Sequence, residues 1–213
     1  MKTNSVITIG RQFGSGGRYV GRLLAEKLEI PFYDKELLAE ASKESGICEE
    51  MFEDHDEKPT RSLLFSLVTG LQMRGDAGSV YMDMPLNHKI FLAQFDTIRN
   101  IAAKGPCVIV GRCADYVLRD EKNVVSVFVK ADMEDRKARA VKYYNVDPAK
   151  AEDVIRKADK QRASYYDYYA TATWGAVDNY DLCVDTGAVG VDGAVDVIAQ
   201  FVELQEKFRQ EKQ

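Results

Sequence analysis

The sequence lacks any long hydrophobic run, and this absence excludes a protein that crosses a membrane by helices. No apolar stretch among its 213 residues approaches the roughly 20 residues that a bilayer-spanning helix needs. The apolar stretch within the opening MKTNSVITIG is also too short for a signal peptide. We therefore expect a cytoplasmic protein that has no membrane partner.

The sequence also has few cysteines and histidines, and it has no excess of positive charge. The four cysteines show no metal-site spacing, and Cys107 and Cys183 lie in apolar runs where buried thiols are expected. His55 and His88 have no partner pattern, so we assign neither a catalytic role. The 29 basic residues are outnumbered by 34 acidic residues, which argues against a nucleic-acid partner. The pattern indicates neither metal ligands nor an oligomeric state.

A glycine-rich turn between a short strand and a helix is the most informative feature that the sequence has. The β-branched run 6–9 leads into Gly14, Ser15, Gly16 and Gly17, and an amphipathic helix follows at once. Glycines let backbone N–H groups converge on an anion, and the helix N-terminus adds its positive end. The turn is therefore expected to hold phosphate. Such a loop usually continues with Lys and then Ser or Thr, whereas positions 17 and 18 hold glycine and arginine.

Two other interpretations of the turn stay open. A dinucleotide-binding loop would use the Gly-Ser-Gly of positions 14–16 with Asp34, twenty residues beyond the first glycine. The third small residue of that pattern would then be Tyr19, which would obstruct close packing of helix against strand. The second alternative is a tight connection that binds nothing, and the flanking cations Arg11 and Arg18 argue against it.

Strands alternate with helices along most of the chain, which indicates a parallel sheet flanked by helices with ligands at the strand C-termini. A hydrophobic content of 46% suffices for the core of a single domain over residues 1–213. Residues from about 49 to 87 fit the alternation worst, and we expect an inserted substrate lobe there. Strands are expected at 6–9, 30–34, 107–110, 124–129 and 182–184, and helices after the loop, at 35–45, 88–104, 132–144 and 148–169, and beyond an Asp192 cap.

Several segments, in this order, resemble the cytidylate kinase-like family, a divergent branch of the P-loop nucleoside monophosphate kinases. The resemblance runs through ITIGRQFGSGGRYVGRLLAEKLEIPFYDKELL, VIVGRCADYVLRD, VFVKADMEDRKARAVKYY, DKQR and YDLCVDT, and it omits about 49–87. It implies an α/β fold of the P-loop three-layer α/β/α type, with a parallel sheet, a small inserted substrate lobe and a helical lid at about 137–169. It also implies ATP and Mg²⁺ as cofactors and a small-molecule nucleotide as substrate.

The chain also departs from that family at its phosphate loop. Arg11 replaces the first glycine, Gly17 replaces the lysine, and Arg18 replaces the hydroxyl residue that normally ligates Mg²⁺. These changes leave Mg²⁺ placement and a preference for CMP open. Arg18, helped by Arg11, is our candidate to replace the lysine, with a solvated surface arginine as the alternative.

Further charged residues are candidates because phosphoryl transfer needs charge neutralisation and in-line positioning. Arg112 follows a buried strand and is the candidate for the acceptor phosphate, with a structural ion pair as the alternative. Asp34 would position the acceptor or a metal-bound water, unless it caps the next helix. Arg136 and Arg139, like Asp159 and Arg162, lie one helical turn apart, where a lid would close them over the phosphates. The alternative is that these four residues are ordinary exposed charges that take no part in binding the phosphates.

The expected site is thus a set of loop, lid and acceptor residues. The run of tyrosines at 165–169 is interpreted as the packed end of a helix instead of a base-stacking platform. The nucleotide-binding candidates are Arg11, Gly14, Ser15, Gly16, Gly17, Arg18, Arg136 and Arg139. The catalytic candidates are Arg18, Arg112, Asp159 and Arg162, and the acceptor-binding candidates are Asp34 and Arg112.

The leading hypothesis is a phosphotransferase that moves the ATP γ-phosphate to a small acceptor, with a nucleoside monophosphate as the first candidate. A second hypothesis is a nucleotide-binding regulator that lost catalysis together with the loop lysine. A third is a kinase of a different small molecule on the same scaffold.

Overall fold

The computed structural model of the chain describes residues 3–34, 86–170 and 172–212, together with residues 37, 39, 43 and 45. The four isolated residues are helical, in agreement with a helix over 35–45. The expected substrate lobe lies outside the described residues except for its last two positions. Among the described helices, none is long and apolar enough to span a bilayer.

A five-stranded parallel sheet forms the centre of the molecule, in the order β2–β3–β1–β4–β5. β1 lies between β3 and β4, with Ile7 opposite both Val108 and Val125. The parallel arrangement brings the carboxyl ends of the strands to one edge, where the residues that follow β1, β2 and β3 meet. The strands are β1 (Val6–Arg11), β2 (Phe32–Tyr33), β3 (Cys107–Val110), β4 (Val124–Lys130) and β5 (Leu182–Asp185).

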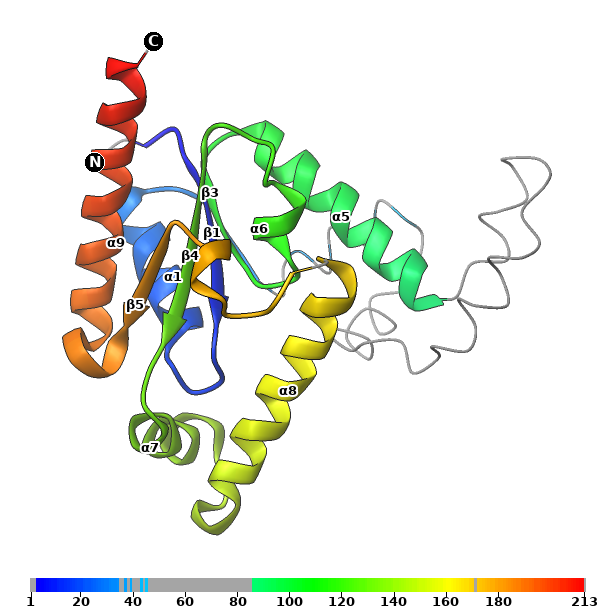
Figure 1. Cartoon of the computed structure of the whole chain (residues 1–213), viewed down its shortest axis with the longest axis vertical. Coiled ribbons are helices and arrows are strands. Elements are labelled where there is room, and N and C mark those ends of the chain that lie inside the picture. The colour runs from blue at the N-terminus through cyan, green and yellow to red at the C-terminus, as the bar shows by residue number, and fades with distance from the viewer. Residues whose placement is uncertain are drawn as a thin grey trace, which may run out of the picture.

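Helices cover both faces of this sheet and make it the middle of three layers (Figure 1). α1 (Gly17–Leu28) and α9 (Thr186–Glu211) pack on one face, where alternate strand residues such as Ile9 and Val127 form the larger core. α5 (Leu86–Lys104) and the short α6 (Ala114–Val117) pack on the other face. The expected three-layer α/β/α fold is confirmed.

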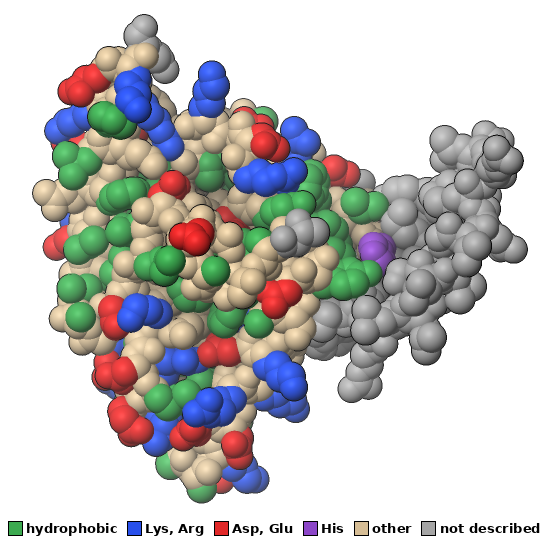
Figure 2. Space-filling view, viewed as in Figure 1, with side chains coloured by type: hydrophobic (Ala, Val, Ile, Leu, Met, Phe, Trp, Pro, Cys, Tyr) green, Lys and Arg blue, Asp and Glu red, His purple; other side chains and the backbone are tan. Residues whose placement is uncertain are grey.

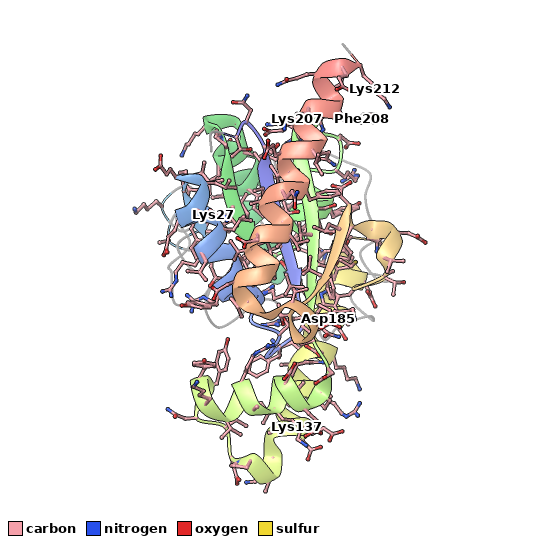
Figure 3. The ribbon with its side chains drawn as sticks, turned by 90° about the vertical axis from the view of Figure 1, so that its left-hand side faces the viewer. Lys27, Lys137, Asp185, Lys207, Phe208 and Lys212 are labelled. Atoms are coloured by element: carbon pink, nitrogen blue, oxygen red, sulfur yellow. The ribbon has the colours of Figure 1, made fainter. Side chains whose placement is uncertain are left out.

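The region expected to be a lid consists of α7 (Met133–Tyr144) and α8 (Ala151–Tyr169), joined by a 3₁₀ turn at Pro148–Lys150. A second 3₁₀ turn, Val177–Asn179, precedes β5. α7 lies across the end of the sheet at which Asp185 is labelled (Figure 3). Basic and acidic side chains are interspersed over this end of the molecule (Figure 2). The side chain of Asp147 caps the 3₁₀ turn by accepting from the Ala149 amide at 3.0 Å.

The start of the terminal helix differs from the sequence expectation. α9 begins at Thr186, and Asp185 caps it by accepting from the Gly187 amide at 2.9 Å. Gly190 has φ 72° and ψ 176°, which interrupts the helical path, so that two helical segments meet there and the second begins directly after Gly190. The expected helix beside Asp192 is this second segment, whereas the cap of the whole element is Asp185 and the first turns, from Thr186 on, were not expected from the sequence.

The N-terminal segment is tied to the far end of the chain by one carboxylate. Glu206 Oε1 accepts hydrogen bonds from Thr3 Oγ1 at 2.6 Å, from the Asn4 amide at 2.9 Å and from Ser5 Oγ at 2.6 Å. Burial works to raise the pKa of Glu206, but the hydrogen bonds from Ser5, Thr3 and Asn4 together hold it below its usual value. The charged form of Glu206 therefore stabilises the fold.

We predict that Glu206→Gln lowers the free energy of unfolding by about 1 kcal/mol at neutral pH, because three donors lose an ionised acceptor. Since the folded pKa lies below the unfolded one, this contribution is present above the unfolded pKa and is lost as pH falls through the folded pKa. Urea unfolding at about pH 7 and about pH 4 measures both effects. Glu203→Gln on the same helix, which breaks only an exposed pair with Lys207, is the control. A pH-independent loss in Glu206→Gln would contradict the prediction.

Candidate functional site

The glycine-rich turn between β1 and α1 presents the open end of a helix. Gly14 and Gly16 have φ of 77° and 81°, left-handed values that glycine adopts without strain. Gly16 is the N-cap of α1 and has no side chain, and the Gly17 amide donates to Ser15 Oγ at 3.3 Å. An anion can therefore bind the other first-turn amides at this helix N-terminus.

The turn is anchored from its buried side. The carbonyl oxygen of Ser15 accepts from Thr186 Oγ1 at 2.7 Å and from Arg139 Nη1 at 3.3 Å. Arg139 also donates to Thr186 Oγ1 at 2.9 Å. Ser15 itself is fully buried, and its hydroxyl donates to the Gln12 carbonyl at 2.9 Å. Arg139, expected at the nucleotide, thus binds the loop backbone here, and the sequence contained no signal of its contact with Thr186.

The charged residues of α7 and α8 also reach this turn. Asp159 Oδ1 accepts from the Phe13 amide at 2.7 Å, and Asp159 Oδ2 pairs with Arg136. Arg136 Nε donates to the Phe13 carbonyl at 2.8 Å. One turn further along α8, Arg162 donates to the Arg11 carbonyl at 3.2 Å. Arg136 and Arg139 share one face of α7, and Asp159 and Arg162 share one face of α8. All four side chains therefore contact the backbone of the phosphate loop or of the strand end that leads into it.

Two arginines from different elements share the carboxylate of Asp34. Arg18 Nε, at the start of α1, lies 2.5 Å from Asp34 Oδ2, and Arg112 Nη1, just beyond β3, lies 3.2 Å from Asp34 Oδ1. The Arg112 side chain is 1% exposed, against 53% for Arg18. Arg112 and Cys113 also adopt left-handed φ of 55° and 56°, an unusual backbone for two non-glycine residues in succession. Such conformations collect at functional sites.

A pocket of about 210 Å³ lies between the loop, Asp34 and α8. It is lined by four arginines and by a single acid, and this predominance of positive charge suits an anionic ligand. The pocket is lined by Arg11, Gln12, Phe13, Gly14, Gly16, Gly17, Arg18, Asp34, Arg112, Tyr144 and Arg162. Three of the expected site residues, Arg136, Arg139 and Asp159, do not line it.

A smaller cavity of about 20 Å³ adjoins this pocket and shares Arg11, Arg112 and Arg162 with it. Two of its other lining residues are hydrogen-bonded, since Tyr166 donates to Asp115 Oδ2 at 2.6 Å. Burial raises the pKa of Asp115, and burial together with the Asp115 charge raises the pKa of Tyr166. The phenol therefore stays a hydrogen-bond donor at neutral pH.

The same tyrosine belongs to the packed end of α8. Tyr165 and Tyr166 are buried with Cys113 and Ala170, and Tyr169 stacks on Phe91 at 4.0 Å between ring centroids. Tyr165 and Tyr166 therefore lie in the packed helix end expected from the sequence. Their position on the wall of the smaller cavity was not expected from their spacing.

The described residues contain no group of three or more side chains suited to hold a metal ion. Asp34 is the acid of the pocket, and both of its oxygens contact arginines. A Mg²⁺ ion bound here would take its ligands mainly from nucleotide phosphates and water, because Asp34 already contacts arginines through both oxygens.

Comparison with known proteins fits this geometry. A model of the cytidylate kinase-like family matches residues 6–188. A solved structure of an uncharacterized protein from Eubacterium ventriosum ATCC 27560 is 31% identical, with a TM-score of 0.69 over 93% of this chain and 98% of that one. No curated protein matches the chain.

More distant structures share the fold. Shikimate kinase from Bacteroides thetaiotaomicron is 14% identical, with a TM-score of 0.54 over 93% of this chain and 98% of that one. A gluconokinase from Sinorhizobium meliloti 1021 is 15% identical, with a TM-score of 0.50 over 99% of both chains. At these identities, the likeness concerns the backbone arrangement.

The close approach of α7 to the turn generates a prediction about Gly14. A Cβ at this position would lie 2.7 Å from the Arg136 carbonyl oxygen, a backbone atom, whereas a Cβ at Gly16 would meet only Val191 Cγ2, at 3.3 Å. Both glycines have a left-handed φ. We expect Gly16→Ala to cost about 1 kcal/mol of stability and Gly14→Ala about 3 kcal/mol, since only the latter adds a clash with backbone to the strain of the left-handed conformation. Urea unfolding measures both, and equal losses would show that the contact with α7 is unimportant.

Proposed function

The chain belongs to the cytidylate kinase-like family, and from that premise we propose that it transfers the γ-phosphate of ATP to a small acceptor. A nucleoside monophosphate is the first acceptor to test. We place the reaction in the cytoplasm, with Mg²⁺ bound to the nucleotide. Family and fold support a kinase-type phosphotransferase, while the identity of the acceptor is our proposal.

One observation carries the proposal: a glycine turn at a helix N-terminus opens into a pocket that is lined by four arginines. Phosphoryl transfer requires little covalent help from the protein, because catalysis rests on positioning and on neutralising the charge of the phosphates. Backbone amides at residues 14–17 would hold the β-phosphate. Fixed guanidinium groups around them would stabilise the charge that develops during transfer.

The arginines would divide between the two substrates. Arg18 and Arg11 lie at the loop and would contact ATP, with Arg18 also connected to Asp34. Arg112 lines both the pocket and the smaller cavity, so it would bind the acceptor phosphate, and Asp34 would orient it. Mg²⁺ would supply further positive charge at the phosphates when bound.

The lid region would complete the site. Arg162 lines the pocket, and Asp159, with Arg136, holds the loop at Phe13. Closure of α7 and α8 over both substrates would exclude water and prevent transfer to it. In this proposal Arg136 and Arg139 act on the nucleotide through the loop backbone that they bind.

Two alternatives remain as hypotheses with an observation behind each. The glycine at position 17 and the arginine at position 18 favour a nucleotide-binding regulator without catalysis. The guanidinium groups of Arg112 and Arg162 fit carboxylate as well as phosphate, which favours a kinase of a different small acid.

A turnover panel distinguishes these functions. The protein is incubated with ATP, Mg²⁺ and each of the common nucleoside monophosphates in turn, and ADP formation is measured beside calorimetric ATP binding. We expect ATP binding and ADP formation that depends on one of the monophosphates. ATP binding without turnover on any of them would favour the alternatives, and a failure to bind ATP would contradict the proposal.

A second prediction concerns Arg112. Arg112→Lys keeps the charge but loses the bidentate geometry, so we expect kcat/KM for the acceptor to fall about tenfold or more while the Kd for ATP changes less than about twofold. Arg119→Lys, an exposed pair with Asp120, is the matched control. If thermal stability and ATP binding fall together and acceptor kinetics do not change, Arg112 is a structural partner of Asp34 only.

A further inference from the structure

We infer that the phosphate loop has exchanged two of its side chains, so that Arg11 occupies the place of the phosphate-binding lysine and Gly17 is glycine because Arg11 is there. The inference rests on the proposed function, since it names the cation that binds the ATP phosphates. In the usual loop pattern the first position is glycine and the lysine comes six residues later. Positions 11 and 17 have that spacing and carry the opposite residue types.

The space at Gly17 is already filled by Arg11. A Cβ built on Gly17 would lie 2.5 Å from Arg11 Cβ and 3.2 Å from Arg11 Cγ. It would also lie 3.2 Å from Cβ of Val129, a fully buried residue of β4 that cannot move away. Non-bonded carbon atoms pack at about 3.5–4.0 Å, so position 17 cannot carry even alanine while Arg11 keeps this place.

Backbone conformation does not explain the glycine. Gly17 is absent from the glycines with positive φ, and it is the first residue of α1, where helical φ and ψ suit any L-residue. A glycine in a helix also costs stability relative to alanine. The requirement at this position is therefore one of space, and Arg11 imposes it.

The two positions open into the same pocket. Arg11 and Gly17 both line it, beside Gly14 and Gly16. Because a Cβ on residue 17 would lie only 2.5 Å from Cβ of residue 11, a long cationic side chain that starts from one position can reach the space served by the other. Arg11 is held firmly for this task, since its backbone pairs with Val129 in the sheet and its carbonyl accepts from Arg162.

The contacts of Arg18 make it the weaker candidate. Its Nε lies 2.5 Å from Asp34, which directs the side chain toward the end of β2 and the acceptor side of the pocket. This differs from the expectation from sequence, in which Arg18 replaces the lysine with help from Arg11. The geometry points to the reverse assignment, with Arg11 on the ATP phosphates and Arg18 linking the loop to Asp34.

The test measures ATP binding by calorimetry in a set of loop variants, with folding checked by circular dichroism. Arg11→Ala is expected to weaken ATP binding about ten- to hundredfold, the scale for losing a hydrogen bond between charged groups. Gly17→Ala, with Arg11 still in place, is expected to lower the melting temperature. The double variant Arg11→Gly with Gly17→Lys restores the usual pattern, so it should bind ATP within about threefold of the unaltered chain.

The matched control is Arg11→Gly with Gly17→Ala, which resolves the clash but supplies no cation and should bind ATP as weakly as Arg11→Ala. Unchanged ATP binding in Arg11→Ala would overturn the inference. So would a lysine double variant that binds no better than its alanine control. If the lysine double variant fails to fold, stronger binding by Arg11→Lys than by Arg11→Ala supports the inference, and equal binding overturns it.

Failure of the proposed function is visible separately. ATP binding that depends on Arg11, without turnover of any acceptor, would overturn the transfer reaction and support the exchange.

Discussion

A single buried carboxylate holds the ligand end of the sheet together. Asp34 follows β2 and pairs with Arg18 from α1 and with Arg112 from the end of β3, so it connects the phosphate loop to the acceptor side. Removing its charge would leave the Arg112 guanidinium buried with less compensation, which proteins tolerate poorly. The same carboxylate is the acid that lines the pocket, together with four arginines. Its ion pairs therefore fix two of those arginines relative to the phosphate loop.

In the region expected to be a lid, most of the described charged side chains at the turn bind the protein itself. Asp159 and Arg136 use their charges on each other and on the Phe13 backbone. The Asp159 carboxylate and the Arg136 guanidinium therefore position the loop backbone and do not contact a phosphate directly. Arg162, in contrast, reaches the pocket while its guanidinium also binds the Arg11 carbonyl. The described contacts of α7 and α8 thus chiefly fix the geometry of the glycine-rich turn.

The parts of this structure that depend on local sequence pattern could be predicted from the sequence. The glycine turn, the strand at 107–110 and the helix that begins after Asp132 follow from periodicity, capping and turn chemistry. Helical spacing also placed Arg136 beside Arg139 on one face. It could not reveal what that face meets, because the partners Phe13 and Thr186 lie far away in the sequence. The kink at Gly190 was not predicted either, because the apolar periodicity is visible only in the longer segment of α9 that follows it.

The hydrogen bonds that Glu206 accepts also set an order of assembly. Thr3, Asn4 and Ser5 find their partner about two hundred residues later in the chain, and β1 pairs with strands that begin at Cys107 and Val124. On the ribosome, the strand at the centre of the sheet must therefore wait for most of the chain before it can pair on both sides. Contacts of such long sequence separation slow folding. During synthesis, the apolar residues of β1 therefore remain unpaired for longer than those of any other described strand of the sheet.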